Sequence, residues 1–285
     1  MLNWIISGII MGGVLSLTVM GIAVIYGITG VTNFSLGIIG VLGAFTTWYL
    51  MESFNWLFAV IVGVALSFIL GYFIQYFLLN PVSEKGGEPN LYFILTVSLG
   101  LIFTGLIKVI FPRPDISLIL PRMGLFTIGG ITASGLKYFA LFFSVSILIL
   151  LRLLEEKTLL GKKWIATSQN LKLAKLIGIN TKQAFCIASG IGYALAAMGA
   201  IIWGALYNIN LMSGWDLTFL GYIIAVVGGI GNIWGGLIAA LIMGMVMSFS
   251  GHFLGGMWQS VILYAIVIFV LIVSPRGILG HEKSI

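Results

Sequence analysis

The amino-acid sequence predicts an all-α, polytopic membrane protein with about eight or nine transmembrane or half-membrane helices, some broken at glycine-rich segments. Of its 285 residues, 60% are hydrophobic and 8% are charged, whereas soluble domains carry roughly 25% charged residues. The mean hydropathy is +1.16. Several apolar stretches of about 20 residues are long enough to cross the roughly 30 Å hydrocarbon core of a bilayer. The chain is therefore expected to fold in lipid.

Apolar runs predict six continuous spans, a long interrupted segment and a last span. No linker indicates a second domain, so residues 1–285 are expected to form one transmembrane domain. Tryptophan and tyrosine residues near many of the expected ends fit the aromatic belts of membrane interfaces. The expected bounds are 4–27, 34–51, 56–79, 91–111, 136–154 and 184–206, then the interrupted segment 217–250 and the span 258–274.

A basic loop predicts the orientation. Lys and Arg concentrate in cytoplasmic loops, so loop 155–182 is expected in the cytoplasm, and the tail with Arg276 and Lys283 on the same side. Both can be cytoplasmic only if 217–250 crosses an even number of times, as two half-spans or a re-entrant pair broken at "GGIGNIWGG". Segment 112–135 is then extracytoplasmic. The basic residues of the loop and its flanks are Arg152, Lys157, Lys162, Lys163, Lys172, Lys175 and Lys182.

The composition argues against enzymes, metal sites and nucleic-acid binding. Cys186 is the only cysteine, and His252 and His281 lack partners, so no metal cluster is expected. The net charge of +6 reflects the loops rather than a nucleic-acid surface. There is no paired acid, HExxH motif or Ser/His or Ser/Lys dyad within the spans, so no catalytic residue is predicted. No G-x-x-x-x-G-K-[ST] occurs, so ATP would be hydrolysed by another chain.

Two glycine-rich interruptions, 31–45 and 227–240, lie one in each half of the chain, and each carries one asparagine. Interrupted hydrophobic segments in corresponding halves are typical of the solute site of a transporter. Non-helical backbone survives in a membrane only where it is buried in protein or lines a wet cavity. The residues predicted to line a translocation path are Asn33, Ser35, Gly37, Gly228, Gly229, Gly231 and Asn232.

Packing is the alternative explanation for these glycines. Gly236, Ala240 and Gly244 recur every four residues, a spacing typical of tight helix–helix contacts in membranes. Asp216 likewise has two interpretations. It can cap the N-terminus of the interrupted segment, where negative charge is favourable, or it can act as a gate or a contact for a substrate amine.

The basic loop is expected to contain a short amphipathic helix between two caps. Ser168 or Asn170 can begin the helix, and Gly178 can end it in a left-handed conformation. "NTKQ" at 180–183 fits a capping box that starts the next span. The apolar stripe is too small to form a core, so it needs the lipid surface or a partner protein. The residues assigned to a partner contact are Leu173, Ala174, Leu176, Ile177 and Gly178.

Four stretches in the same order and spacing resemble the membrane subunits of ABC importers for branched-chain amino acids, and the length suits the shorter of the two paired permeases. The stretches are "GIAVIYGITGVTNFSLGIIGVLGAF" (21–45), "LGKKWIATSQNLKLAKLIGIN" (160–180), "AVVGGIGNIWGGLIAALIMG" (225–244) and "SPRGILG" (274–280).

The resemblance implies an assembly in the cell inner membrane. A second permease subunit, usually a paralogue, completes the pathway. Two cytoplasmic ATPases bind the loop helix and hydrolyse ATP, and an extracytoplasmic binding protein delivers the substrate. The chain itself binds no cofactor, metal or nucleic acid and contacts membrane lipid. Relatives commonly have a His and a polar residue near positions 36 and 38, where this chain has Leu36 and Ile38, and an acidic residue at the position of Lys172.

A membrane scaffold or an intramembrane enzyme is the least favoured alternative, because the spans contain no paired acid or catalytic dyad. Two other functions remain open at the level of sequence. One is an ABC permease for urea, a short amide or a sugar, although the sugar branch typically has an acidic residue near the first interruption. The other is an ion-coupled secondary transporter, a class that usually carries carboxylates or histidines within its spans. Asp216 is the only candidate for such a group.

Overall fold

Long helices make up most of the chain. The structure is a computed structural model that describes residues 2–120, 124–128, 131–274 and 277–279. Seven described helices are long and apolar enough to cross a membrane, and two shorter apolar helices accompany them. This confirms the all-α, polytopic class. The helices are α1 (Leu2–Thr29), α2 (Leu36–Leu50), α3 (Trp56–Ile74), the π-helix η1 (Gln75–Leu79), α4 (Asn80–Glu84), α5 (Pro89–Ile110), α6 (Gly135–Lys157), α7 (Leu159–Gln169), α8 (Leu171–Leu176), α9 (Thr181–Leu206), α10 (Ser213–Gly228), α11 (Ile233–Phe253) and α12 (Gly256–Val273).

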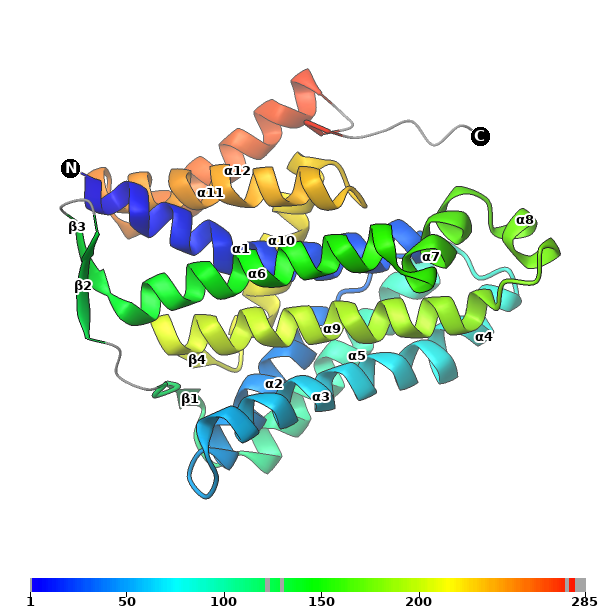
Figure 1. Ribbon diagram of the computed structural model, residues 1–285, viewed down its shortest axis with the longest axis horizontal. Helices are drawn as coiled ribbons and strands as arrows, with labels where there is room; N and C mark the ends of the chain where they lie inside the picture. The colour runs from blue at the N-terminus through cyan, green and yellow to red at the C-terminus, as the bar shows by residue number, and fades with distance from the viewer. Residues whose placement is uncertain (1, 121–123, 129–130, 275–276, 280–285) are drawn as a thin grey trace.

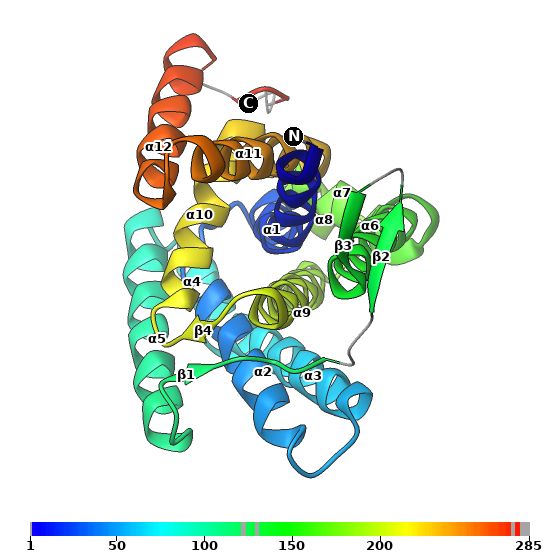
Figure 2. The same cartoon turned by 90° about the vertical axis from the view of Figure 1, so that its left-hand side faces the viewer.

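Helices α1, α6, α9 and α11 run side by side along the long axis of the molecule (Figure 1). Helices α7 and α8 lie at one end of this axis, which we call the basic end because it carries the basic loop. Seen along the axis, α10 lies between α5 and α12, and α6 lies on the opposite side of the molecule (Figure 2). Helices α1 and α9 form the core, with 89% and 78% of their spanning windows buried, against 17% for α5 and 11% for α12.

Two small sheets lie at the other end, which we call the distal end (Figure 1). Strand β1 (Asp115–Ile116) pairs antiparallel with β4 (Ile209–Asn210), and β2 (Leu125–Ile128) pairs antiparallel with β3 (Ile131–Ser134). The first pair attaches the segment after α5 to the turn between α9 and α10. Because β1 and β4 are far apart in sequence, this pairing fixes the beginning of α10 relative to that segment.

Small residues allow α1 and α11 to pack closely. A Cβ atom added to Gly12 would come within 2.6 Å of the Ala240 carbonyl oxygen, and one added to Gly244 would overlap the backbone of Gly12. Backbones that approach this closely are typical of membrane helices with small residues four apart. These contacts confirm the packing interpretation for Ala240 and Gly244.

Several boundaries differ from those that the sequence predicts. The interrupted segment 217–250 is two helices, of which α10 is short and α11 has the length of a full span, so the expectation of two half-spans is wrong for the second. The span expected at 56–79 continues through η1 and α4 to Glu84. Helix α7 was not predicted. The tail residues Arg276 and Lys283, and His281, lie outside the described residues.

Candidate functional site

The first break separates α1 from α2 and covers only residues 30–35. Gly30 has a φ of 71° and its N–H donates to the carbonyl of Tyr26, which ends α1 in the left-handed conformation that glycine adopts most easily. The loosely wound segment expected at 31–45 is therefore too long. From Leu36 onward the chain is a regular α-helix.

Four side chains from three parts of the fold form a buried polar cluster, which consists of Asn33, Ser35, Tyr193 and Tyr222. The hydroxyl of Ser35 is 2.8 Å from Oδ1 of Asn33 and 2.6 Å from the hydroxyl of Tyr193, and the Tyr193 hydroxyl is 3.0 Å from the same Oδ1. The backbone N–H of Asn33 donates to the hydroxyl of Tyr222. Tyr193 is the thirteenth of the 26 residues of α9, so the cluster lies about halfway along a spanning helix.

One donor in this cluster has no partner. The Nδ2 atom of Asn33 is buried and makes no hydrogen bond within the described residues. The backbone N–H of Ser35 donates to Oδ1 of Asn33, which fixes the oxygen and nitrogen ends of this amide. A buried donor without an acceptor costs about 1–3 kcal/mol. The break is thus held by hydrogen bonds and carries one unsatisfied group.

An aromatic cluster, composed of Phe34, Phe93 and Phe219, covers the polar cluster. Phe34 stacks on Tyr222 with ring centroids 4.7 Å apart, and meets Phe93 of α5 at 5.0 Å and Phe219 of α10 at 6.0 Å. Phe93 and Phe219 are 47% and 49% exposed. Asn33 is 1% exposed, so Phe34 and its two neighbours, rather than Asn33, form the accessible surface of this break.

Gly37 serves packing in the described structure. Its N–H donates to the hydroxyl of Thr218, and an added Cβ would overlap that hydroxyl and the carbonyl oxygen of Gly214. The beginning of α2 therefore lies directly against α10. This contact positions Phe34 between α5 and α10.

The second break, residues 229–232, lies at the basic end and is held by the chain itself. Asn232 caps α11 by accepting from the N–H of Gly235, and its amide donates to the carbonyl of Leu279. Leu279 in turn donates its N–H to the carbonyl of Gly228. Asn232 and Asn33 share no partner among these hydrogen bonds, so the two asparagines do not form one polar site.

The positive φ angles of Gly229 and Gly231, 100° and 87°, make the sharp turn between α10 and α11. Gly231 also contacts Gly27 near the end of α1. Gly228 and Gly235 face one another, and a Cβ on either would overlap the other's carbonyl oxygen. All three glycines of the predicted path in this break therefore have a structural reason to be glycine.

Asp216 does not cap α10. The helix begins three residues earlier, at Ser213, and Asn210 accepts the N–H bonds of Met212 and Ser213 with its Oδ1. Asp216 lies in the first turn, where the helix dipole favours a negative charge, and its side chain is exposed. The capping interpretation is wrong, and the carboxylate lies free on the outer side of α10.

The loop helix α8 forms as the sequence predicts. Asn170 accepts from the N–H of Leu173, and Gly178 follows the helix with a φ of 82°. Asn180 then caps α9 by accepting from the N–H of Gln183. The exposed fractions of Leu173, Leu176 and Ile177 are 58%, 81% and 72%. Ala174 is buried against this chain, so it supports the helix from within.

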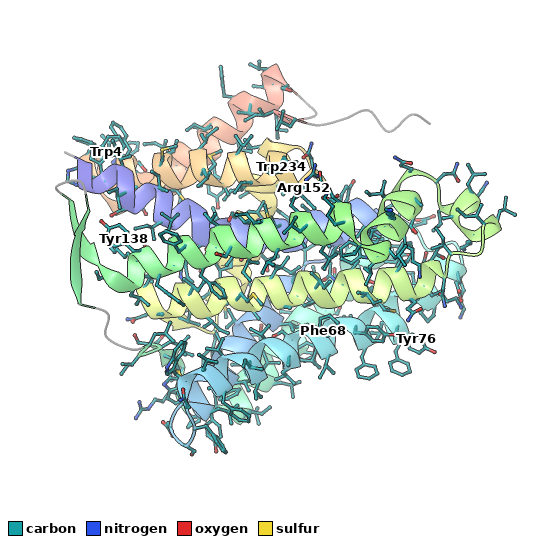
Figure 3. All side chains as sticks on the ribbon, in the orientation of Figure 1. Trp4, Phe68, Tyr76, Tyr138, Arg152 and Trp234 are labelled. Carbon is teal, nitrogen blue, oxygen red and sulfur yellow. The ribbon has the colours of Figure 1, made fainter. Side chains whose placement is uncertain are left out.

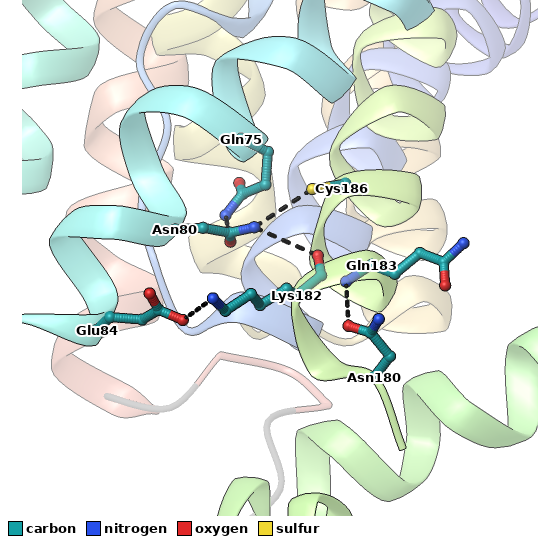
Figure 4. A network of polar contacts seen from close by, with 7 residues as sticks. All are labelled: Gln75, Asn80, Glu84, Asn180, Lys182, Gln183 and Cys186. Carbon is teal, nitrogen blue, oxygen red and sulfur yellow. Dashed lines mark hydrogen bonds and ion pairs between the residues drawn. The ribbon is translucent and has the colours of Figure 1, made fainter. Parts of the chain in front are cut away.

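A second polar network joins η1 and α4 to α9 (Figure 4). The hydroxyl of Ser189 donates to Oε1 of Gln75, whose amide donates to Oδ1 of Asn80 at 2.9 Å. Nδ2 of Asn80 lies 3.3 Å from the sulfur of Cys186. A π-helix is uncommon and often lies at functional sites. Here it turns Gln75 and Asn80 toward α9, just beyond the end of α8.

Charged side chains continue this connection at the basic end. Lys182 at the start of α9 forms an ion pair with Glu84 at the end of α4. Arg152 of α6 lies 5.3 Å from the centroid of the Trp234 ring at the start of α11, and it also pairs with Glu155 (Figure 3). The Lys182–Glu84 and Arg152–Trp234 contacts join α9 to α4 and α6 to α11, whereas the Arg152–Glu155 pair lies within α6.

The tyrosines and phenylalanines of the two clusters are not among the site residues that the sequence predicts. Tyr193 and Tyr222 fall within predicted spans, and a phenol deep in an apolar span is a signal for a buried hydrogen-bond partner. No group of three or more His, Cys, Asp or Glu side chains among the described residues can hold a metal ion.

Comparison with known proteins places residues 4–271 within a family described as branched-chain amino acid transport system, permease component. The chain is 27% identical to the high-affinity branched-chain amino acid transport system permease protein LivH of Escherichia coli K12, over 99% of this chain and 96% of the relative. It is 26% identical to BraD of Pseudomonas aeruginosa, over the same shares. Its fold is similar to that of a chain of PsaBC from Streptococcus pneumoniae in complex with Fab, with a TM-score of 0.51, 12% identity and coverage of 96% and 91%.

Proposed function

This chain belongs to the family of permease components of branched-chain amino acid transport systems, and we propose that it forms one half of the membrane pathway of an ABC importer for those amino acids in the cell inner membrane. It is a multi-pass membrane protein. The basic end is cytoplasmic and the distal end extracytoplasmic, in agreement with the positive-inside rule. The chain catalyses no bond chemistry and binds no cofactor; partner ATPases hydrolyse ATP.

The observation that carries this proposal is the aromatic cluster beside the α1–α2 break. A branched-chain amino acid has an apolar side chain, and exposed phenylalanine rings offer it an apolar surface at the point where α2 and α10, the two short helices, meet. Asn33 and Ser35 contribute by holding the break in place. Transport requires this surface to alternate between the two sides of the membrane, and the unpaired amide of Asn33 can gain a partner when the break moves.

A second permease subunit is the partner we assign to the face formed by α5, α10 and α12. Asp216 is exposed on α10, and α10 lies between the other two helices (Figure 2). A carboxylate that faced hydrocarbon would cost about 2.5–3.5 kcal/mol at the centre of a span. A partner subunit, together with an aqueous path between the two chains, removes that cost and leaves Asp216 as a contact for a substrate amine.

The ATPases bind at α8 in this proposal. Leu173, Leu176 and Ile177 form an exposed apolar stripe on α8. The opposite side of the helix, which carries Ala174, packs against this chain. Gly178 ends the helix, and α9 begins three residues later at Thr181. An extracytoplasmic binding protein delivers the substrate at the distal end.

Uptake of radiolabelled leucine into proteoliposomes tests the proposal. The vesicles contain this chain with its partner permease, both ATPases and the binding protein. We expect uptake that requires ATP and is unaffected by collapse of proton and sodium gradients. Uptake that follows an ion gradient without ATP would establish a secondary transporter instead, and uptake of urea or a sugar in place of leucine would establish a different cargo.

Replacing one ring of the aromatic cluster tests whether this cluster, rather than any exposed aromatic residue, contributes to transport. We expect Phe219→Ala to lower the rate of leucine uptake about tenfold, which corresponds to about 1.4 kcal/mol of lost stabilisation. Phe142→Ala is the matched control because Phe142 is 74% exposed on α6, on the opposite side of the molecule. Equal effects of the two substitutions would show that the aromatic cluster has no special part in transport.

A further inference from the structure

A cavity of about 570 Å³ at the distal end has a lining that the transport pathway does not explain. It lies between α1, α9, α11 and α12, so it meets the proposed partner face only through α12. Figure 3 labels one of its residues, Trp4, at the beginning of α1. We call it the distal cavity. The lining residues that matter here are Trp4, Ser7, Trp203, Tyr207, His252 and Gln259.

The distal cavity lies at the depth of the lipid headgroups. Trp4 is the first residue of one candidate span, Tyr207 follows the last residue of another, His252 precedes the last residue of a third, and Gln259 is the fourth residue of α12. Four spans thus end or begin at this cavity. Tryptophan and tyrosine are concentrated at this level in membrane proteins.

The ends of α11 and α12 that contribute His252 and Gln259 to the cavity are apolar and exposed. The turn between α11 and α12 carries Phe253, Leu254, Met257 and Trp258, with exposed fractions of 54%, 53%, 91% and 53%. Apolar side chains gathered at the end of membrane helices lie within the interface between headgroups and acyl chains. The distal cavity therefore opens beside lipid headgroups.

Four polar side chains of the cavity can each donate a hydrogen bond and have no partner among the described residues, whereas Ser248 donates to the carbonyl of Trp4. The side chains of Ser7, Tyr207, His252 and Gln259 make no hydrogen bond within the part of the chain that the structure describes. Burial raises the pKa of the Tyr207 phenol, so this group remains a neutral donor. Several unpaired donors around one space favour a ligand with several acceptor oxygens, such as a phosphate.

The aromatic walls complement the other charge of a zwitterion. The ring centroids of Trp203 and Tyr207 lie 4.7 Å apart with 41° between their planes, so the two rings form an open wedge. An ammonium group within about 6 Å of such rings gains a cation–π interaction. The lining contains neither Asp or Glu, which would bind an ammonium alone, nor Lys or Arg, which would select a purely anionic headgroup.

We propose that the distal cavity binds the headgroup of a zwitterionic phospholipid, with its ammonium against Trp203 and Tyr207 and its phosphate hydrogen-bonded by His252 and Gln259. The ligand class is an ethanolamine phospholipid, whose small headgroup carries both charges. The bound lipid holds the outer ends of α1, α9, α11 and α12 together.

Native mass spectrometry of the assembled transporter, purified with its partner permease and ATPases, tests this site. The probes are a short-chain phosphatidylethanolamine and a phosphatidylglycerol with the same chains, which has a phosphate but no ammonium. We expect the ethanolamine lipid to bind with a Kd about tenfold lower. Tyr207→Leu and His252→Leu should each raise this Kd about tenfold, whereas Tyr207→Phe, which keeps the ring, should raise it less.

Phe54→Leu is the matched control, because Phe54 is a 54% exposed aromatic residue in the turn between α2 and α3 that does not line the cavity. The same spectra report whether each variant retains all its subunits, so loss of lipid is distinguished from loss of assembly. Equal affinity for the two lipids, or an unchanged Kd in Tyr207→Leu, would overturn the proposal.

Discussion

The exposed stripe of α8 allows the proposed contact with partner ATPases to be weakened without disturbing the permease. We expect Leu176→Ala to lower the affinity of the ATPase subunits for the assembled permease pair about 30-fold. Leu176 is 81% exposed, and removing its side chain beyond Cβ breaks no contact of the buried core. The stability of the permease itself should therefore not change.

The magnitude follows from the apolar surface that docking would bury. Complete burial of a leucine side chain is worth about 1.5–3 kcal/mol. Because Leu176 is 81% exposed in this chain, docking can still bury most of its side-chain surface. Alanine keeps only Cβ, so the substitution loses about 2 kcal/mol of binding free energy, which raises Kd by a factor of about 30. Ile177→Ala should have a similar effect. Because the two residues are neighbours, the double variant should lose less than the sum.

Equilibrium titration of a fluorescent ATPase subunit into permease pairs held in nanodiscs measures this affinity. Leu159→Ala is the control, because Leu159 is a 76% exposed leucine at the beginning of the adjacent α7. An unchanged Kd for Leu176→Ala, or the same loss for both variants, would refute the assignment of α8 as the contact and would favour a helix that lies on the lipid surface.

Three further predictions concern the core. Gly12→Val should prevent close approach of α1 to α11 and reduce the yield of folded protein, whereas Gly105→Val, at a glycine with open space around its Cα, should not, as size-exclusion profiles of the two would report. Asn33→Leu removes the acceptor of three hydrogen bonds. Each is worth about 0.6 kcal/mol in a membrane, and loss of the unpaired amide offsets part of the sum, so thermal unfolding should show about 1 kcal/mol of destabilisation. The rate of leucine uptake should fall by more than this loss of stability accounts for. Gln75→Leu leaves two buried partners unsatisfied and should cost about 2 kcal/mol or more. Glu84→Ala breaks only an exposed ion pair and should lower the melting temperature much less; equal shifts in the two melting curves would contradict this.

Local chemistry made α8 and its caps predictable. Asn170, Gly178 and Asn180 act on backbone groups within three or four positions of themselves, so their residue types alone indicate where the helices begin and end. The spacing of Ala240 and Gly244 likewise indicated a close helix contact, although the partner helix α1 could not be read from it. Composition and hydrophobic run length gave the class and the approximate number of spans.

The candidate site was less predictable because its contacts are distant in sequence. Asn33 indicated a polar need within the membrane, but its partner Tyr193 is 160 positions away and Tyr222 is 189. Sequence also suggested that Asn33 faces the path, whereas these bonds bury it and leave Phe34 at the surface. Asp216 had two interpretations, a cap or a gate, but Asn210 is the residue whose Oδ1 accepts from the N–H groups of Met212 and Ser213 at the start of α10.

The pairing of β1 with β4 couples an accessible loop to a helix that labels cannot easily reach. Asp115 is exposed and pairs with Asn210, three residues before α10 begins. Any tilt of α10 during a transport cycle must displace this loop as well. The sole native thiol, at Cys186, is buried, so a spin label on Asp115→Cys would track the helix from outside the membrane and time its swing against each round of ATP hydrolysis.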